Sequence, residues 1–385
     1  MKILYFAYLG NFKSTGVVKK IIHQIDMLHS QHVSIKGFFL YTSRNSSYIL
    51  EKNPNIQLVR VHGRANEKET IKVIDRIIKR EKDVDFIYFR YPFVSWNLLR
   101  LVKKYPNKFI FEHQTKELDE LKLFQKQRKG FWRQYIRELL LAPLVLRYTR
   151  ASIAVTDEIA MYEQKRAVGN KLVTKTIGNG IDVNATPLRN PPLYDGTQLS
   201  LIFVGGFPAS WHGLDRIIRG IANYSGNVNI TLYIIGNVVS EIEELVKRLG
   251  VEKNIVFIGC QYGKELDNWF DICHIAIGCL GVHRKKMNQA TALKTREYIA
   301  RGIPFILSEN DIDLTHKKEI HPYFLKVQAN DKAINIEKVL KFADTVLHVQ
   351  NHNINMREFA KQNLDMSIKM KELKDFLTTL QSQKL

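Results

Sequence analysis

Apolar residues in the first 160 positions fall into short continuous runs, and the stretches between them carry an apolar residue every three or four positions. The short runs predict β-strands and the periodic stretches predict amphipathic helices. The expected strands lie at 2–9, 33–41, 56–61, 85–90, 108–113 and 152–157. The expected helices lie at 17–30, 67–81 and 118–150. This alternation is typical of right-handed βαβ units built on a parallel sheet.

The same alternation begins again after residue 198. Further strands are expected at 199–206, 229–236, 254–259, 272–279 and 303–308. The intervening segment 186–198 is rich in proline and polar residues, which predicts a linker. We therefore predict an α/β protein of two tandem Rossmann-like domains, 1–185 and 199–355. C-terminal helices over 356–385 could pack back on the first domain. Ligands of such proteins bind at the carboxyl ends of strands and in the cleft between domains.

Residues 288–308 carry the clearest chemical signal. The pattern predicts a helix that begins near Asn288 and stops at Gly302, with a proline two residues later. Glycine adopts the left-handed conformation that closes a helix, and proline cannot continue one. The unpaired N–H groups of a first turn suit an anion such as a diphosphate. Glu297 and Lys294 add a carboxylate and a cation to the same segment.

Composition limits the choice of function. The chain has 385 residues, 45% of them hydrophobic, which indicates a folded globular protein. The net charge of +20 favours an anionic partner: nucleic acid, anionic lipid or a phosphorylated substrate. The three cysteines have no metal or redox spacing and are expected as reduced thiols in a cytoplasmic protein. No apolar run approaches the ~20 residues of a transmembrane helix, and the N-terminus is expected to be a strand, not a signal peptide.

Three motifs follow one another in the order known from one family of enzymes. They are GNGID at 178–182, FVGGFPASWHGLDRII at 203–218 and LKTREYIARGIP at 293–304. Together they resemble the retaining GT-B glycosyltransferases of family 4, the group 1 type that builds bacterial polysaccharides. The resemblance spans nearly the whole chain, and the last two motifs carry most of its specificity.

The resemblance implies a reaction and a binding role for each of the two domains. The expected reaction moves a sugar from a UDP- or GDP-sugar to a saccharide or lipid-linked saccharide, with retention, in cell-surface polysaccharide or glycolipid synthesis. Domain 1–185 would bind the acceptor and domain 199–355 the donor. No metal is expected to be required for the reaction.

The resemblance assigns Glu297 to the ribose hydroxyls of the donor nucleotide. A carboxylate suits this task because it can accept two hydrogen bonds from neighbouring hydroxyls. A surface ion pair with Arg301, four residues further on, is the alternative. Gln289 stands where the family usually has a second glutamate near the reacting sugar. Glutamine can bind sugar hydroxyls but cannot supply a charge.

The turn that should hold the diphosphate departs from the family pattern. It contains Gly205 and Gly206 but lacks the usual arginine and lysine. A leaving diphosphate needs its charge stabilised. The candidate substitutes are His212, Arg284 and Lys285, together with Lys294, and the alternative for the basic run at 283–286 is an exposed loop.

In the first domain, His113 ends a predicted strand. By resemblance it faces the sugar-transfer site. A lone histidine is otherwise more often a structural residue, but the carboxyl end of a strand favours a functional one. Thr15 and Gly16 lie in the first strand-to-helix turn, where glycine allows a ligand to approach the backbone. Arg90 ends another strand and is a candidate contact for a phosphorylated acceptor.

Residues 116–150 mix basic and aromatic side chains. This composition suits contact with an anionic membrane, and we expect the protein in the cytoplasm at the inner face of the cell membrane. A helix with one buried and one solvated basic face is the alternative. Two other function classes stay open: a catalytically weakened partner protein that binds nucleotide sugar, and an epimerase on the same fold. A nucleic-acid-binding protein is a further class, but no nucleic-acid-binding motif in the sequence supports it.

Overall fold

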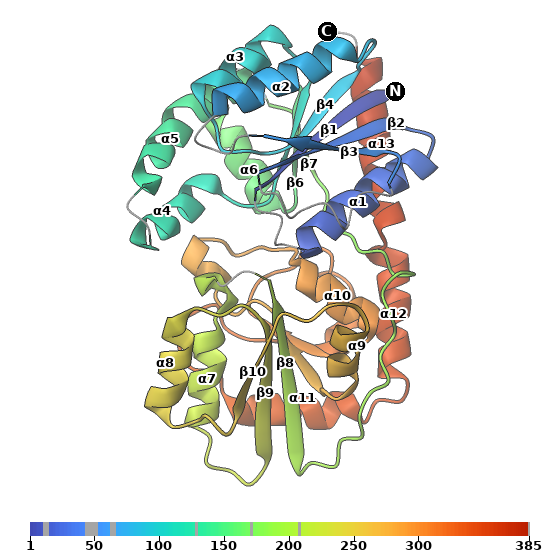
Figure 1. The fold of residues 1–385 in the computed structure, drawn as a ribbon. Helices are drawn as coiled ribbons and strands as arrows, with labels where there is room; N and C mark the ends of the chain where they lie inside the picture. The colour runs from blue at the N-terminus through green and yellow to red at the C-terminus, as the bar shows by residue number, and fades with distance from the viewer. Residues whose placement is uncertain are drawn as a thin grey trace. The chain divides into compact units, whose positions relative to one another are not determined.

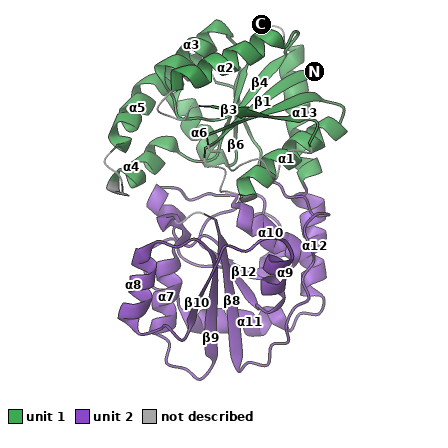
Figure 2. Ribbon diagram, viewed as in Figure 1, with its two compact units in different colours: residues 1–178, 366–385 green, residues 179–365 purple. Residues whose placement is uncertain are grey.

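The computed structural model describes residues 1–10, 15–42, 53–61, 67–127, 130–169, 172–206 and 209–383. The chain divides into two compact units, each built around its own sheet (Figure 2). The first unit comprises Met1–Gly178 and Met366–Leu385, and the second comprises Asn179–Asp365. The chain therefore passes from one unit to the other twice.

The described part of the first unit contains a seven-stranded parallel sheet in the order β3-β2-β1-β4-β5-β6-β7 (Figure 1). Its strands are β1 (Lys2–Gly10), β2 (Ser34–Tyr41), β3 (Ile56–Arg60), β4 (Phe86–Arg90), β5 (Phe109–His113), β6 (Ala151–Ala154) and β7 (Thr174–Thr176). Its helices are α1 (Thr15–Ser30), α2 (Glu67–Arg80), α3 (Trp96–Lys104), α4 (Glu117–Gln127), α5 (Phe131–Arg147), α6 (Asp157–Arg166) and α13 (Met366–Ser382).

Strand β4 shows why these strands appear as continuous apolar runs in the sequence. Phe86 and Tyr88 belong to a core with α1 and α13, whereas Ile87 and Phe89 belong to a core with α2, α3 and α5. Both faces of a parallel sheet are covered by helices, so both sets of alternating side chains must be apolar. Polar groups are left for the strand ends.

The described part of the second unit repeats this design with six parallel strands in the order β10-β9-β8-β11-β12-β13. The strands are β8 (Gln198–Gly205), β9 (Asn229–Gly236), β10 (Ile255–Gly259), β11 (Ile275–Ile277), β12 (Phe305–Leu307) and β13 (Phe324–Lys326). The α-helices are α7 (Leu214–Ala222), α8 (Ser240–Leu249), α9 (Gly263–Asp271), α10 (Leu293–Arg301), α11 (Ile336–Leu347) and α12 (His352–Asn363). The short 3-10 helices are η2 (Ser210–His212), η3 (Val282–Lys285) and η4 (Lys318–Tyr323). The strand order reverses between β8 and β11, where ligands of doubly wound sheets bind.

Two helices differ from the sequence prediction. The single helix expected at 118–150 is two helices, α4 and α5, with Gly130 at the start of the second. The helix expected from Asn288 begins only at Leu293, because the backbone of Gln289 forms a short parallel bridge with Asn310. Its end is as predicted: Gly302 closes α10 in the left-handed conformation, with φ of 73°.

Segment 186–198 packs within the second unit. The buried Arg189 guanidinium donates from Nε to the Gly302 carbonyl (3.1 Å) and from Nη1 to the Cys273 carbonyl (2.5 Å). Burial lowers the pKa of Arg189 to about 9. This segment therefore fastens the end of α10 to the sheet.

A buried arginine in the middle of α10 holds the chain segments around that helix. Arg296 donates to the Asn179 carbonyl (2.7 Å) and forms ion pairs with Asp311 (2.5 Å) and Asp313 (2.6 Å). The GNGID turn and the segment after β12 are thus both fixed to α10.

We expect Arg296→Met to destabilise the second unit strongly, by about 3–5 kcal/mol, because it leaves Asp311 buried without a counterion. Thermal unfolding should show a clearly lower midpoint. Lys361→Met, which removes an exposed helix pair with Glu358, is the control and should change little. Equal midpoints for the two variants would contradict this role of Arg296.

Candidate functional site

Two loops meet at the carboxyl ends of β8 and β11. The amide of Leu280, after β11, donates to the carbonyl of His212, after β8, at 3.0 Å. Gly213 has φ of 67°, and a Cβ there would lie 2.7 Å from the Leu280 carbonyl carbon. Glycine is therefore required for the loops to approach this closely. Beside them, a Cβ on Gly205 would lie 2.7 Å from the Phe203 ring, whereas a Cβ on Gly206 would meet no atom of the described residues within 4 Å.

Lys294, in the first turn of α10, points its ammonium group into this region. The nitrogen lies 3.7 Å from the centre of the Phe203 ring and is buried, although the residue as a whole is half-buried. Among the described residues it has no hydrogen-bond partner. Burial lowers the pKa of Lys294 to about 8, against the opposing effect of Cys279 and Glu309. Such an ammonium lacks the anion that would normally accompany a buried charge.

His212 and Lys285 lie beside Lys294. Burial, reinforced by the charges of Lys294 and Lys285, holds the pKa of His212 well below its usual range. The imidazole is therefore neutral near pH 7 and offers a hydrogen bond, not the positive charge proposed for it from the sequence. The Lys285 ammonium lies 4.7 Å from the centre of the Trp211 ring.

Arg284 serves a different purpose from its neighbours. Its guanidinium forms two hydrogen bonds with Asp215 (2.8 and 2.9 Å), and further ones with Asp331 (2.7 Å) and the Ser210 carbonyl (2.7 Å). These contacts raise its pKa and fasten η3 to α7. Of the basic residues considered from the sequence, Lys294 and Lys285 are the better placed to receive an anion.

Glu297 lies on α10 three residues after Lys294. Its Oε1 accepts a hydrogen bond from Arg301 Nε at 3.0 Å, so the helix pair considered from the sequence does form. The side chain is 27% exposed, and among the described residues Oε2 has no partner. Glu297 can therefore still accept from a ligand. Gln289 lies outside α10, in the bridge with Asn310, so the two residues do not share a helix.

Glu309 is a candidate that the sequence reasoning missed. It follows β12, is almost fully buried, and its Oε2 accepts from the Ser308 amide at 3.2 Å. Burial raises the pKa of Glu309 to about 7. Its Oε1 has no hydrogen-bond partner among the described residues. A carboxylate two residues beyond an apolar strand was visible in the sequence and pointed to the same edge of the sheet.

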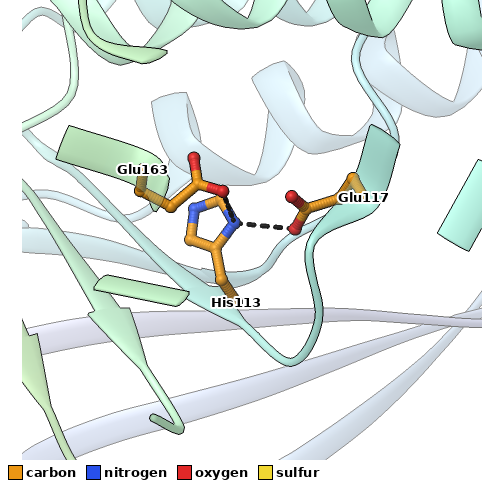
Figure 3. A group of neighbouring side chains, drawn as sticks. All are labelled: His113, Glu117 and Glu163. Carbon is orange, nitrogen blue, oxygen red and sulfur yellow. Dashed lines mark hydrogen bonds and ion pairs between the residues drawn. The ribbon is translucent and has the colours of Figure 1, made fainter. Parts of the chain in front are cut away.

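In the first unit, His113 lies in a buried cluster with two glutamates (Figure 3). Its Nδ1 is 2.9 Å from Glu117 Oε1 and 3.4 Å from Glu163 Oε1. These three residues have donor atoms close enough together to surround a metal ion. Arg166 already pairs with both carboxylates, at 2.8 and 3.0 Å, and with Glu138 at 2.5 Å. The guanidinium supplies the positive charge that the carboxylates require.

This network favours the structural alternative for His113. The residue was predicted to face the sugar-transfer site, but its side chain is 0% exposed. The pKa values of the two glutamates beside His113 are shifted in opposite directions, so the two carboxyl groups differ in protonation. Burial alone would raise the pKa of Glu117, but the charges of His113 and Arg166 lower it to about 2. Burial and the charge of Glu117 raise the pKa of Glu163 well above its usual range.

The other predicted residues of the first unit lie around the reversal point between β1 and β4. Gly16 is exposed in the first turn of α1, whereas the Thr15 side chain and loop 11–14 lie outside the described residues. Arg90 Nη1 is buried without a partner among the described residues. The charge of Arg90 helps Lys20 to lower the pKa of the buried Glu112 to about 2, against the effect of burial.

A cavity of about 240 Å³ lies at the same edge of the first sheet. Residues from α2, α3 and α5 line it together with strand-end residues, among them Tyr8, Arg90 and Tyr91. Its walls combine apolar and polar side chains, and the buried Thr70 hydroxyl has no hydrogen-bond partner among the described residues. The cavity has room for part of a small ligand.

No protein-family model and no curated protein matches the sequence. Solved structures do match it along nearly its whole length. A glycosyltransferase from Rickettsia africae ESF-5 has a TM-score of 0.66 and 14% identity, with 100% of both chains covered. Anabaena Alr3699/HepE in complex with UDP-glucose has a TM-score of 0.63 and 14% identity, covering 98% of this chain and 100% of that chain. The lipopolysaccharide outer core galactosyltransferase WaaB has a TM-score of 0.65 and 13% identity, covering 98% and 99%.

The chain has the GT-B fold. The predicted class of two Rossmann-like α/β domains is thereby confirmed, with parallel sheets of seven and six strands in the described residues. At this level of identity the likeness establishes the GT-B fold, and the roles of individual residues must be argued from the site.

We expect Lys294→Met to stabilise the protein at pH 7. The pKa of Lys294 falls from 10.5 to about 8 on folding, so the buried charge costs about 3 kcal/mol wherever both states are protonated, below pH 8. The cost of burying the charge decreases as the pH rises from 8 to 10.5. The difference in stability between the variant and wild type should decrease over the same range. Thermal unfolding at pH 7 and pH 9.5 measures it, with the exposed Lys247→Met as control. A variant less stable than wild type at pH 7 would refute this account.

Proposed function

We propose that the protein is a glycosyltransferase that moves a sugar from a UDP- or GDP-sugar to a saccharide or lipid-linked saccharide acceptor. We further propose retention of configuration, and a place in cell-surface polysaccharide or glycolipid synthesis. The observation that carries the proposal is the buried, unpartnered ammonium of Lys294 at the strand reversal of the second sheet. The fold supports it, since HepE, which shares the fold, is in complex with UDP-glucose.

The donor diphosphate would take the place of the missing counterion of Lys294. Helix α10 has no side-chain cap at Ala292. The amides of Thr295 and Arg296 donate to the Ala292 carbonyl, so the amides of Leu293 and Lys294 are the ones that would meet the same anion. Lys285 adds a second positive charge, and His212 a neutral hydrogen bond. In a site sheltered from water these groups stabilise the negative charge that develops on the leaving diphosphate.

Glu297 would bind the ribose of the donor. Its Oε2 is without a partner in the described structure, and Oε1 already accepts from Arg301. The hydrogen bond from Arg301 fixes the orientation of the Glu297 carboxylate. A pre-oriented acceptor loses less rotational freedom when the ribose hydroxyls bind.

The chemistry of transfer does not rely on a charged residue at Gln289. An amide cannot serve as nucleophile or base, so assistance by an oxygen of the leaving diphosphate fits the site best. We propose that no metal is needed, because Lys294 and Lys285 provide the positive charge. The cavity of the first unit is our candidate for part of the acceptor site.

Gln289 also motivates a second candidate function. A protein with this fold and a weakened site would bind nucleotide sugar and assist a partner transferase. Binding without transfer or hydrolysis of the sugar would favour that candidate.

We expect Glu297→Ala to weaken binding of the preferred nucleotide sugar by ~10-fold or more, because a hydrogen bond to a charged group is lost. A thermal-shift screen of UDP-, GDP- and dTDP-sugars identifies the ligand, and titration calorimetry measures the affinity. Glu244→Ala on the exposed face of α8 is the control. Unchanged affinity and turnover in Glu297→Ala would remove Glu297 from the site. Transfer should persist in EDTA, and its rescue by manganese after EDTA treatment would contradict a metal-free reaction.

Helix α5 presents a surface that fits a membrane. Five large apolar side chains are exposed at helical spacing along it: Trp132, Ile136, Leu139, Leu140 and Leu144. The opposite face is buried in the core of the first unit. Arg133 and Arg137 are exposed on the same helix, and the chain as a whole is strongly basic. Within the described residues, no helix combines the length and apolar composition needed to cross a bilayer.

We propose that α5 lies on the inner face of the cell membrane, where a lipid-linked acceptor would be found. An exposed apolar stripe flanked by arginines binds at the interface of anionic lipids. This surface is independent of the donor site, so its failure would leave the donor assignment untouched.

Leu140→Glu should abolish co-sedimentation with vesicles that contain anionic phosphatidylglycerol, because the substitution adds a charge to the centre of the apolar stripe. Leu140 is 63% exposed, so the fold should tolerate the change. Leu193→Glu is the matched control, since Leu193 is 92% exposed in the second unit. Equal sedimentation of the two variants would exclude α5 as the contact surface.

A further inference from the structure

Buried polar atoms without a partner gather around the beginning of α10. Among the described residues they include Lys294 Nζ, Thr295 Oγ1, Asn179 Oδ1 and Glu309 Oε1. Asn179 is held against the segment before the helix by a 2.6 Å bond from Nδ2 to the Thr291 carbonyl. Buried polar groups are nearly always hydrogen-bonded in folded proteins, so several unpartnered ones in one place indicate a ligand.

Lys294 and Glu309 are the two members of this group that influence each other. Each acts on the pKa of the other through its charge. Even so, no ion pair or hydrogen bond joins them in the described structure, and each keeps an atom without a partner. The geometry agrees, because Ser308, beside Glu309, donates to the Cys279 carbonyl after β11 and Lys294 lies over Phe203 of β8. Both groups therefore lie at the carboxyl ends of the neighbouring strands β8, β11 and β12.

The residues around Glu309 argue against a metal ion between the two groups. Asp311, the next carboxylate along the chain, is occupied by Arg296 at 2.5 Å. In the described residues, the group that could surround a metal lies in the first unit, around His113. A cation would also be repelled by Lys294.

A phosphate group alone would satisfy only half of the pair. Its oxygens can accept from Lys294, but they carry no proton for Glu309 in its ionised form and would be repelled by that carboxylate. A hydroxyl group suits both partners, because it donates its proton to Glu309 and accepts from Lys294. In a nucleotide sugar, hydroxyl groups lie next to the diphosphate, on the sugar that is transferred.

We propose that Glu309, together with Lys294, binds a hydroxyl group of the transferred sugar and so determines which donor sugar the enzyme accepts. The inference rests on the proposed function. It assigns the two residues different tasks: Lys294 contacts both the diphosphate and the sugar, whereas Glu309 contacts the sugar alone.

The test compares a nucleoside diphosphate with its sugar derivatives. The probes are UDP with UDP-glucose, UDP-galactose and UDP-N-acetylglucosamine, and GDP with GDP-mannose. Affinities are measured by titration calorimetry for wild type, Glu309→Gln and Lys294→Met. Glutamine keeps the size of glutamate and removes its charge, and thermal unfolding of each variant confirms that it is folded.

The expected result is a selective loss. Glu309→Gln should bind the free diphosphate within about threefold of wild type and lose ~10-fold or more in affinity for the preferred nucleotide sugar, because a buried acceptor is lost. Lys294→Met should lose affinity for both ligands. Equal effects of Glu309→Gln on both ligands would overturn the inference. The absence of any effect on either ligand would also overturn it, and is the result expected if Glu309 binds only water.

Two failures can be told apart. If wild type binds no nucleoside diphosphate and no nucleotide sugar, the proposed function itself is wrong. If wild type binds the diphosphate but no sugar derivative binds more tightly, the donor site stands and the hydroxyl contact of Glu309 is excluded.

Discussion

Covering both faces of a parallel sheet with helices leaves only the strand ends for polar chemistry. Both units of this protein obey that constraint, since strands such as β4 are apolar on both sides. The polar residues with unusual surroundings then gather at the carboxyl ends: Arg90 and His113 in the first unit, Lys294 and Glu309 in the second. The reversal of strand order separates neighbouring loops and makes room for a ligand there.

The two units handle buried charge in opposite ways. In the first unit, Arg166 pairs with Glu117, Glu138 and Glu163, and burial raises the pKa of the last two so that they favour the neutral form. This network joins α4, α5 and α6 to the sheet through His113. In the second unit the ammonium of Lys294 has no counterion in the described structure. A balanced network stabilises one conformation, whereas an unbalanced charge stores free energy that an anionic ligand can release.

Local patterns allowed much of the fold to be predicted, because strand runs, helical periodicity and the glycine that ends α10 depend on neighbouring residues. Gly302 ends its helix as expected, and the GT-B class followed from such motifs. The start of α10 was misjudged because Gln289 pairs with Asn310, which lies beyond the helix and the next strand.

The candidate site was harder to predict, for the same physical reason. The commitment of Arg284 to Asp215 and Asp331, and the complete burial of His113 beside Glu163, depend on residues about 50 to 70 positions away in the chain. Glu297 and Lys294 were identified because helix geometry places them near one another. Glu309 was overlooked because a single acidic residue after a strand has no distinctive spacing.

The double passage of the chain between units has a consequence for biosynthesis. Helix α13, which follows the second unit in the chain, contributes Met370, Leu373 and Leu377 to the core that also contains Ile3 and Tyr5 from the first strand. The second unit is continuous in sequence, and its residues are synthesised before that helix. Part of the apolar face of the first sheet therefore stays uncovered until α13 emerges. A nascent chain with this order of assembly is a natural client for a chaperone that shields apolar surface.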